Sequence, residues 1–67
     1  MAKQVKVGDR VSLLRDDRPG IMAPSPQNVG KVGIVERVVR DRGASYYLVD
    51  LGNGHDYVDR LCLEVLP

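Results

Sequence analysis

Apolar and polar residues alternate near the start of the chain with the period of a β-strand. The apolar residues Val5, Val7, Val11 and Leu13 all have odd numbers, whereas the even positions between them are mostly polar. A period of two buries one face of a strand and leaves the other in water. Residues 8–9 (Gly-Asp) interrupt the alternation and predict a turn or bulge between two short strand pieces.

The regular pattern stops over residues 16–30, which are rich in turn-forming residues. Three prolines in this segment exclude it from a central strand. A loop of about fifteen residues is longer than most connections in compact domains, and such loops are commonly functional or disordered. Ile21 and Met22 lie within it, and we expect them either to pack beneath the loop or to face a partner.

A second strand is predicted over residues 31–40, where apolar residues occur at both parities. Val32 and Ile34 share one face, and Val35 belongs to the other. A bent strand that serves two parts of a sheet needs apolar residues on both faces, and Gly33 is a natural bending point.

Residues 53–54 (Asn-Gly) predict a β-hairpin, since this dipeptide favours two-residue hairpin turns. A two-residue turn there pairs Asp50 with Tyr57. The same register pairs Val49 with Val58 on the core-facing side. The outward-facing residues of the hairpin are then Tyr46, Leu48, His55 and Tyr57.

Residues 59–61 predict a turn or a single turn of 3₁₀ helix, and residues 62–66 predict a short closing strand. Five short strands in one domain, residues 1–67, predict a small, partly closed barrel, because closure removes unpaired strand edges. The core predicted from strand parity comprises Val7, Val11, Leu13, Val32, Ile34, Val49, Leu51, Val58, Leu63 and Val65.

Four segments of the chain together carry a resemblance to a known group of proteins. They are Val-Gly-Asp-Arg-Val at 7–11, a proline-containing loop, Val-Gly-Lys-Val-Gly-Ile-Val at 29–35 and Leu-Glu-Val-Leu at 63–66. In these motifs the chain resembles the electron-transport accessory group of SH3-like barrels. That group includes the nitrile hydratase β-subunit barrel, photosystem I subunit IV, the variable chain of ferredoxin–thioredoxin reductase and short cyanobacterial SH3-like proteins. The resemblance implies an all-β, SH3-like, five-stranded, partly open barrel with one long loop after the first strand.

Composition and charge narrow the class of protein. Apolar residues make up 43% and charged residues 28%, which argues against wholesale disorder. The net charge of +1 is not that of a protein that coats nucleic acid, although residues 1–45 carry a balance of +4 and residues 46–67 one of −3. Without a secretory signal or an apolar run of membrane-spanning length, and with the single cysteine Cys62, the chain is expected to be cytoplasmic.

The residues with reactive side chains do not form a recognisable catalytic or metal-binding pattern. His55 has only Asp56 beside it, and adjacent strand residues face opposite ways. Cys62 is expected to be a small buried hydrophobe. Asp50, Asp56 and Asp59 lack the spacing of a calcium loop. We therefore expect no catalytic residues, no metal ligands and no cofactor, and a protein that is not an enzyme.

A partner-binding surface is predicted on the long loop and the outward tyrosines. Prolines restrict the unfolded loop, so ordering it on a partner costs less free energy. Amphipathic aromatic residues are good interface anchors. The predicted partner is another protein, within a larger redox or regulatory complex, and the oligomeric state is left open. The predicted contact residues are Arg18, Ile21, Met22, Tyr46 and Tyr57.

The alternative function is nucleic-acid binding. The KOW motif of ribosomal and transcription proteins also places a Gly-Asp-x-Val opening before a Gly-x-x-Gly-x-Val segment, but here the long loop stretches that spacing. In this alternative, basic residues of the second strand and its turn contact phosphates. They are Lys31, Arg37, Arg40 and Arg42.

Overall fold

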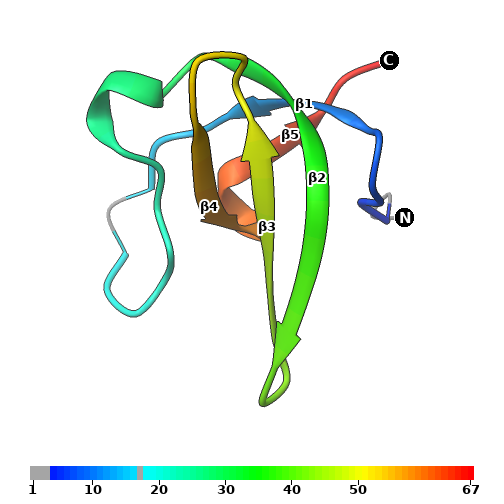
Figure 1. Ribbon diagram of the computed structural model, residues 1–67. Helices are drawn as coiled ribbons and strands as arrows, with labels where there is room; N and C mark the ends of the chain where they lie inside the picture. The colour runs from blue at the N-terminus through cyan, green and yellow to red at the C-terminus, as the bar shows by residue number, and fades with distance from the viewer. Residues whose placement is uncertain (1–3, 17) are drawn as a thin grey trace.

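The computed structural model describes residues 4–16 and 18–67, which fold into a single antiparallel sheet of five strands (Figure 1). The strands follow one another in the order β4-β3-β2-β1-β5, so β4 and β5 are the two edges and the sheet is not closed. The fold class expected from the sequence, a small, partly open all-β barrel with a long loop after the first strand, is confirmed. The strands are β1 (Arg10–Leu13), β2 (Val32–Asp41), β3 (Ala44–Asp50), β4 (His55–Asp59) and β5 (Leu63–Val65).

Two 3₁₀ helices complete the described chain. η1 (Pro26–Asn28) lies within the long loop, where no regular element was predicted. η2 (Arg60–Cys62) joins β4 to β5 and confirms the predicted short helical turn. The carboxylate of Asp59 caps η2, accepting a hydrogen bond of 3.0 Å from the backbone N–H of Leu61. The described residues contain no helix with the length and apolar character needed to cross a membrane.

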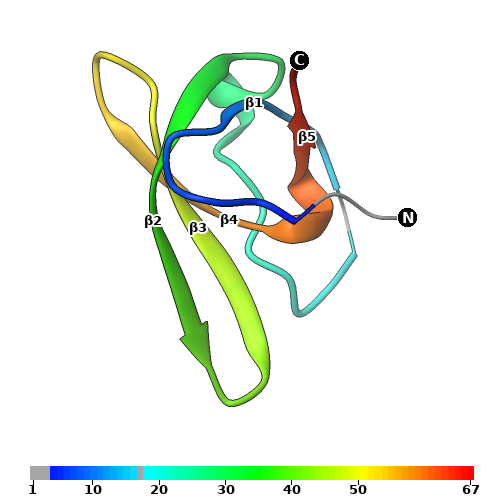
Figure 2. The same ribbon diagram turned by 90° about the vertical axis from the view of Figure 1, so that its right-hand side faces the viewer.

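β2 is the longest strand, and it curves so that its first residues pair with β1 and the remainder with β3 (Figures 1 and 2). Gly33 lies in the part that bends over β3. A Cβ at this position would lie 2.5 Å from the carbonyl oxygen of Asp50 and 2.6 Å from Cγ1 of Val49. Only glycine therefore permits this close approach of the two strands.

The close approach at Gly33 reverses the predicted faces at the start of β2. Val32 and Ile34 are 48% and 42% exposed, so their assignment to the core was wrong. Val35 is fully buried instead, opposite Val49 of β3. Because a glycine contacts β3 from the inner face, the even-numbered neighbours must face water. A β-bulge between Val35 and Arg37 then shifts the alternation by one residue.

A turn also breaks the parity near the N-terminus. The backbone N–H of Asp9 donates to the carbonyl of Lys6 at 3.1 Å, and Gly8 has a φ of +96°. Val5, before the turn, is buried, but Val7, within it, is 62% exposed, so its predicted place in the core was wrong. The predicted turn itself is confirmed, although only the piece after it, β1, forms a strand.

The β3–β4 hairpin has the predicted faces but a different register. Asp50 pairs with His55 rather than with Tyr57, so the loop contains residues 51–54 instead of two residues. The N–H of Leu51 donates to the carbonyl of Gly54 at 2.8 Å within this loop. The pairing differs from the predicted one by two residues, which leaves every side chain on the same face of the sheet.

The core lies between the β1–β5 end of the sheet and the β3–β4 end, which folds over it (Figure 2). Ile21 from the long loop, Leu51 and Val65 pack against this core from its periphery. The buried core residues are Val5, Val11, Leu13, Val35, Tyr47, Val49, Val58, Cys62 and Leu63.

Candidate partner-binding face

The side of the sheet turned away from the core carries three rows of side chains across β2, β3 and β4. We call these nine residues the outer face. They follow from the strand registers, each row containing one residue from each strand. The rows are Ile34, Asp50 and His55; Arg37, Leu48 and Tyr57; and Val39, Tyr46 and Asp59.

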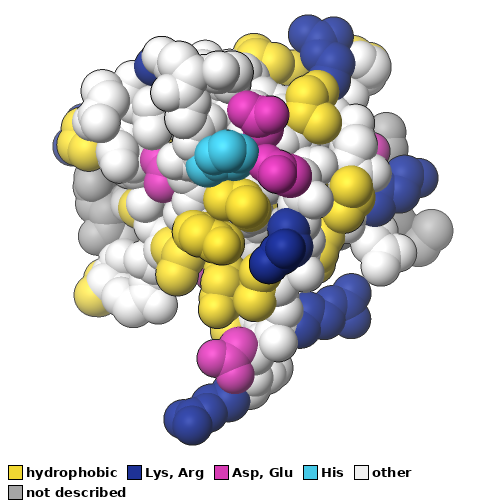
Figure 3. Space-filling model, viewed as in Figure 1, with side chains coloured by type: hydrophobic (Ala, Val, Ile, Leu, Met, Phe, Trp, Pro, Cys, Tyr) yellow, Lys and Arg dark blue, Asp and Glu magenta, His cyan; other side chains and the backbone are white. Residues whose placement is uncertain are grey.

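An apolar patch covers the middle of the outer face, below the histidine in the view of Figure 3. Tyr46 and Tyr57 lie diagonally across β3 and β4, with ring centroids 6.0 Å apart and planes inclined by 76°. This edge-to-face arrangement is favourable for aromatic pairs. Tyr57 and Ile34 are each 42% exposed, and Leu48 between them is half-buried. The outer face therefore exposes contiguous apolar surface supported by a rigid sheet.

A shallow hollow of about 440 Å³ connects the long loop to this patch. Ile21 and Met22 line it from the loop, and Tyr46 lines it from β3. Met22 is 42% exposed, whereas Ile21 is half-buried against the core. The structure thus brings Ile21, Met22, Tyr46 and Tyr57 together into one continuous surface.

The loop is fixed to β4 by hydrogen bonds at two positions. The carboxylate of Asp56 accepts hydrogen bonds from the backbone N–H of Ser25 and from Nδ2 of Asn28, both at 2.9 Å. The N–H of Asp59 donates to the carbonyl oxygen of Met22 at 2.7 Å, along the free edge of β4. This role of Asp56 is not predicted by the sequence pattern. Its position in the strand alternation does indicate a need for hydrogen-bond partners, because Asp56 lies on the core-facing side of an edge strand, where a carboxylate must be paired.

Arg18, the fifth predicted contact residue, does not line the hollow. Its Nε donates to both carboxylate oxygens of Asp16 at 3.0 Å, and its backbone N–H donates to Oδ1 at 2.9 Å. These hydrogen bonds, together with the charge of the guanidinium, lower the pKa of Asp16 from 3.8 to about 2. Arg18 thus pairs with Asp16 at the start of the loop, and its side chain remains largely exposed.

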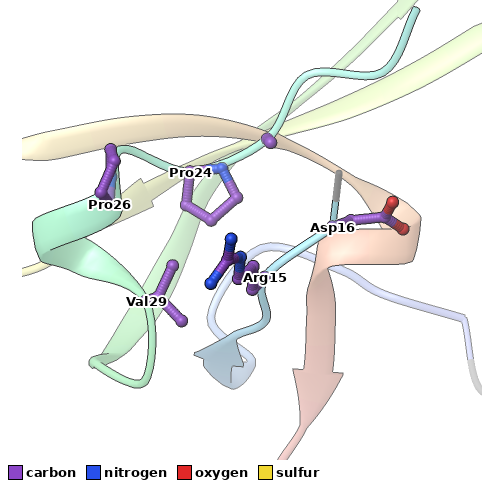
Figure 4. Close-up of a pocket in the computed structure, with 6 residues that line it drawn as sticks. Arg15, Asp16, Pro24, Pro26 and Val29 are labelled. Carbon is purple, nitrogen blue, oxygen red and sulfur yellow. The ribbon is translucent and has the colours of Figure 1, made fainter. Parts of the chain in front are cut away.

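A second pocket of about 330 Å³ lies on the other side of the loop (Figure 4). The guanidinium of Arg15 points into it between Pro24 and Val29, whereas the carboxylate of Asp16 points away. Pro26 of η1 lines the same pocket. This pocket combines an apolar wall with the cation of Arg15, and none of its lining residues belongs to the outer face.

The four basic residues of the nucleic-acid alternative are spread along β2 rather than gathered. Lys31 precedes β2, and Arg42 lies at the opposite end, in the turn with a φ of +51°. Arg37 belongs to the outer face, whereas Arg40 has the parity of the core-facing Val38. The β2–β3 hairpin projects beyond the rest of the molecule in both ribbon views (Figures 1 and 2).

The single histidine and the single cysteine differ in their exposure to solvent. His55 is exposed, as expected, and its Nε2 lies 2.7 Å from Oε2 of Glu36. Cys62 is fully buried in η2, and burial, followed by the nearby carboxylates of Asp16 and Asp59, raises the pKa of its thiol.

The three carboxylates considered for a metal site point in different directions. Asp56 binds the loop, Asp59 caps η2, and Oδ1 of Asp50 accepts a hydrogen bond of 2.8 Å from the N–H of Gly52. Each of the three carboxylates thus makes a separate structural contact.

Comparison with known proteins gives no relative for this arrangement. No protein-family model matches the chain, and no curated protein or solved structure matches it.

Proposed function

We propose that this barrel is a non-enzymatic, cytoplasmic accessory subunit that binds another protein within a larger redox or regulatory complex. The outer face and the adjoining hollow form its binding surface. The observation that carries the proposal is the continuity between the aromatic pair, the half-buried Tyr46 and the exposed Tyr57, and the exposed loop residue Met22. The resemblance of the glycine and valine motifs to SH3-like accessory barrels supports the same function.

The proposed binding surface is already ordered before it meets a partner, which favours binding. Association costs free energy when loops and side chains become ordered. Here the loop is already fixed to β4 through Asp56, and two tyrosines support each other on a sheet, so little ordering is left to occur. Large aromatic residues surrounded by polar neighbours are typical centres of protein interfaces.

The positions of the reactive side chains support a non-enzymatic role. A nucleophilic cysteine needs an accessible thiolate, but Cys62 is fully buried and the pKa of its thiol is raised. His55 lies on the opposite side of the sheet from the core that contains Cys62, so the two do not form a base–nucleophile pair.

A pair of double variants tests the proposal. Met22→Ser with Tyr57→Ser removes two exposed apolar contacts from the proposed surface. Val7→Ser with Val29→Ser removes two exposed apolar residues outside it and serves as the matched control. We expect the immobilised wild type and the control to retain the same partner protein from a cell extract at high salt. The first variant should lose that protein while its melting temperature changes little. Equal retention by all three proteins would contradict the proposed surface.

Nucleic-acid binding is the second candidate, favoured by one row of the outer face. Arg37 lies in one row with Leu48 and Tyr57, so a cation and an exposed aromatic ring flank Leu48 on the same face. Such a combination contacts phosphates and stacks bases. Titration with single- and double-stranded nucleic acid at two salt concentrations distinguishes the candidates. Binding that falls steeply with salt and weakens in Arg37→Gln supports this second function, and binding to neither form excludes it.

A further inference from the structure

We propose that Glu36, Asp50 and His55 form a binding site for a divalent transition-metal ion of the zinc class. Each of these residues offers one ligand atom, and the three atoms all lie within 4.8 Å of one another. They come from three adjacent strands, so residues separated by up to nineteen positions in the sequence meet at one end of the outer face. This inference concerns a ligand site and is independent of the proposed protein partner.

The sheet itself positions the three side chains. Asp50 and His55 are direct cross-strand partners at the ends of β3 and β4, and neighbours of this kind are close enough to bind one ion. Glu36 belongs to the β-bulge of β2, where it is left without a partner in the ladder. Its carboxylate extends over β3 and reaches His55 at 2.7 Å.

The chemistry of the three ligands selects the kind of ion. Imidazole nitrogen and carboxylate oxygen are both ordinary zinc ligands, whereas calcium and magnesium prefer oxygen ligands alone. In a tetrahedral zinc site, ligand atoms about 2.1 Å from the metal lie about 3.4 Å from one another. All three residues are exposed, and small movements of His55 and Glu36, of about 1 Å, would bring the ligand atoms to this geometry around Asp50. The remaining coordination position would hold water.

One of the ligands is already oriented. Oδ1 of Asp50 accepts the N–H of Gly52 at 2.8 Å, which fixes the carboxylate and leaves its second oxygen available. Hydrogen bonds of this kind orient metal ligands and increase affinity. A bound ion would lie between His55 and Glu36, whose Nε2 and Oε2 atoms already face each other at 2.7 Å.

Isothermal titration of the full chain with Zn²⁺ alone tests the site, together with two-dimensional NMR spectra. We expect a single Zn²⁺ to bind and to shift the ring signals of His55 and the amide signals near Glu36 and Asp50. His55→Ala should weaken binding at least tenfold, and Asp50→Asn and Glu36→Gln should each weaken it severalfold. Asp41→Asn and Glu64→Gln remove the same charge from exposed positions elsewhere and should leave the affinity unchanged.

Two results would overturn the site. One is an affinity for Zn²⁺ that stays the same in His55→Ala. The other is a set of shifts centred on Cys62, the other strong zinc ligand of the chain, instead of on the outer face. Circular dichroism of each variant shows that it is folded, and loss of partner binding in the serine variants described above would leave this result unaffected.

Discussion

Gly33 illustrates how one residue without a side chain decides the direction of a whole strand. Its missing Cβ makes room for the backbone of β3, with the carbonyl oxygen of Asp50 as the nearest atom. That contact turns Val35 inward and Ile34 outward. The exposed apolar surface of the outer face therefore depends on a glycine that is itself buried.

We predict that Gly33→Ala destabilises the protein by about 1–3 kcal/mol, because the added methyl group overlaps with rigid backbone. Gly54→Ala is the matched control, since a Cβ there meets nothing within 4 Å and its φ is not in the left-handed region. Urea unfolding of the two variants measures the difference. Equal midpoints for the two would show that β3 moves away from β2 at little cost.

Asp16 and Arg18 give a prediction for acid conditions. The hydrogen bonds from Arg18 lower the pKa of the Asp16 carboxyl from 3.8 to about 2, so this pairing stabilises the folded chain above pH 3.8. The contribution is lost as the pH falls through about 2. NMR titration of the carboxyl carbon should show a midpoint near the lower value in the wild type. In Arg18→Gln the midpoint should rise towards 3.8, and an unchanged midpoint would contradict the assigned cause.

At the scale of elements, the sequence predicts faces better than registers. The β3–β4 hairpin forms where Asn-Gly was found, but with a four-residue loop, and only the pairing partners differ from expectation. Strand parity survives a shift of two residues, so Val49 and Val58 still face the core. A dipeptide signal indicates where a hairpin turns, whereas the exact loop length depends on packing around Leu51, which contacts the core.

Parity fails where a local feature interrupts the strand. Val7 lies in a turn and Val32 precedes the close contact at Gly33, and neither effect appears in a count of odd and even positions. The candidate surface, too, is only partly predictable from parity. The outward tyrosines follow from parity, but the hydrogen bonds that join the loop to Asp56 link residues 28 and 31 positions apart, and the sequence pattern carries no information on such pairs.

Asp56→Ala should release the long loop from β4. The carboxylate accepts two hydrogen bonds, and loss of a charged acceptor leaves the N–H of Ser25 unsatisfied at a partly buried site, so we expect a loss of about 1–3 kcal/mol. Hydrogen exchange at the amide of Ser25 should accelerate strongly. Asp41→Ala, on the exposed β2–β3 hairpin, should change neither quantity. Unchanged protection of Ser25 would mean that the contact with Met22 alone holds the loop.

At the scale of the whole molecule, one small core determines the integrity of every surface. Among the residues that the structure describes, it contains nine buried ones, drawn from all five strands or their flanks, and Cys62 is among the fully buried ones. In so small a domain, no part of this core is expected to open without the rest.

Cys62 therefore serves as a probe of global unfolding. Alkylation requires the thiolate, and burial both raises the pKa of this thiol and blocks access to it. We predict that labelling of the folded protein by iodoacetamide is slow, and that its rate increases with urea in parallel with loss of structure measured by circular dichroism. Rapid labelling without denaturant would show that η2 opens independently of the core.

The attachment of the loop along β4 also affects how molecules of this protein behave towards one another. A strand at the border of an open sheet presents free backbone groups that pair readily with a second chain. Here the carbonyl oxygen of Met22 already accepts a hydrogen bond from the N–H of Asp59, and the carboxylate of Asp56 accepts one from the N–H of Ser25 in the adjoining part of the loop. The loop thus covers part of one of the two edges of the sheet, and we expect it to reduce pairing of β4 with a second chain. Variants that release it are expected to form concentration-dependent aggregates, in which the loop of one molecule pairs with β4 of the next.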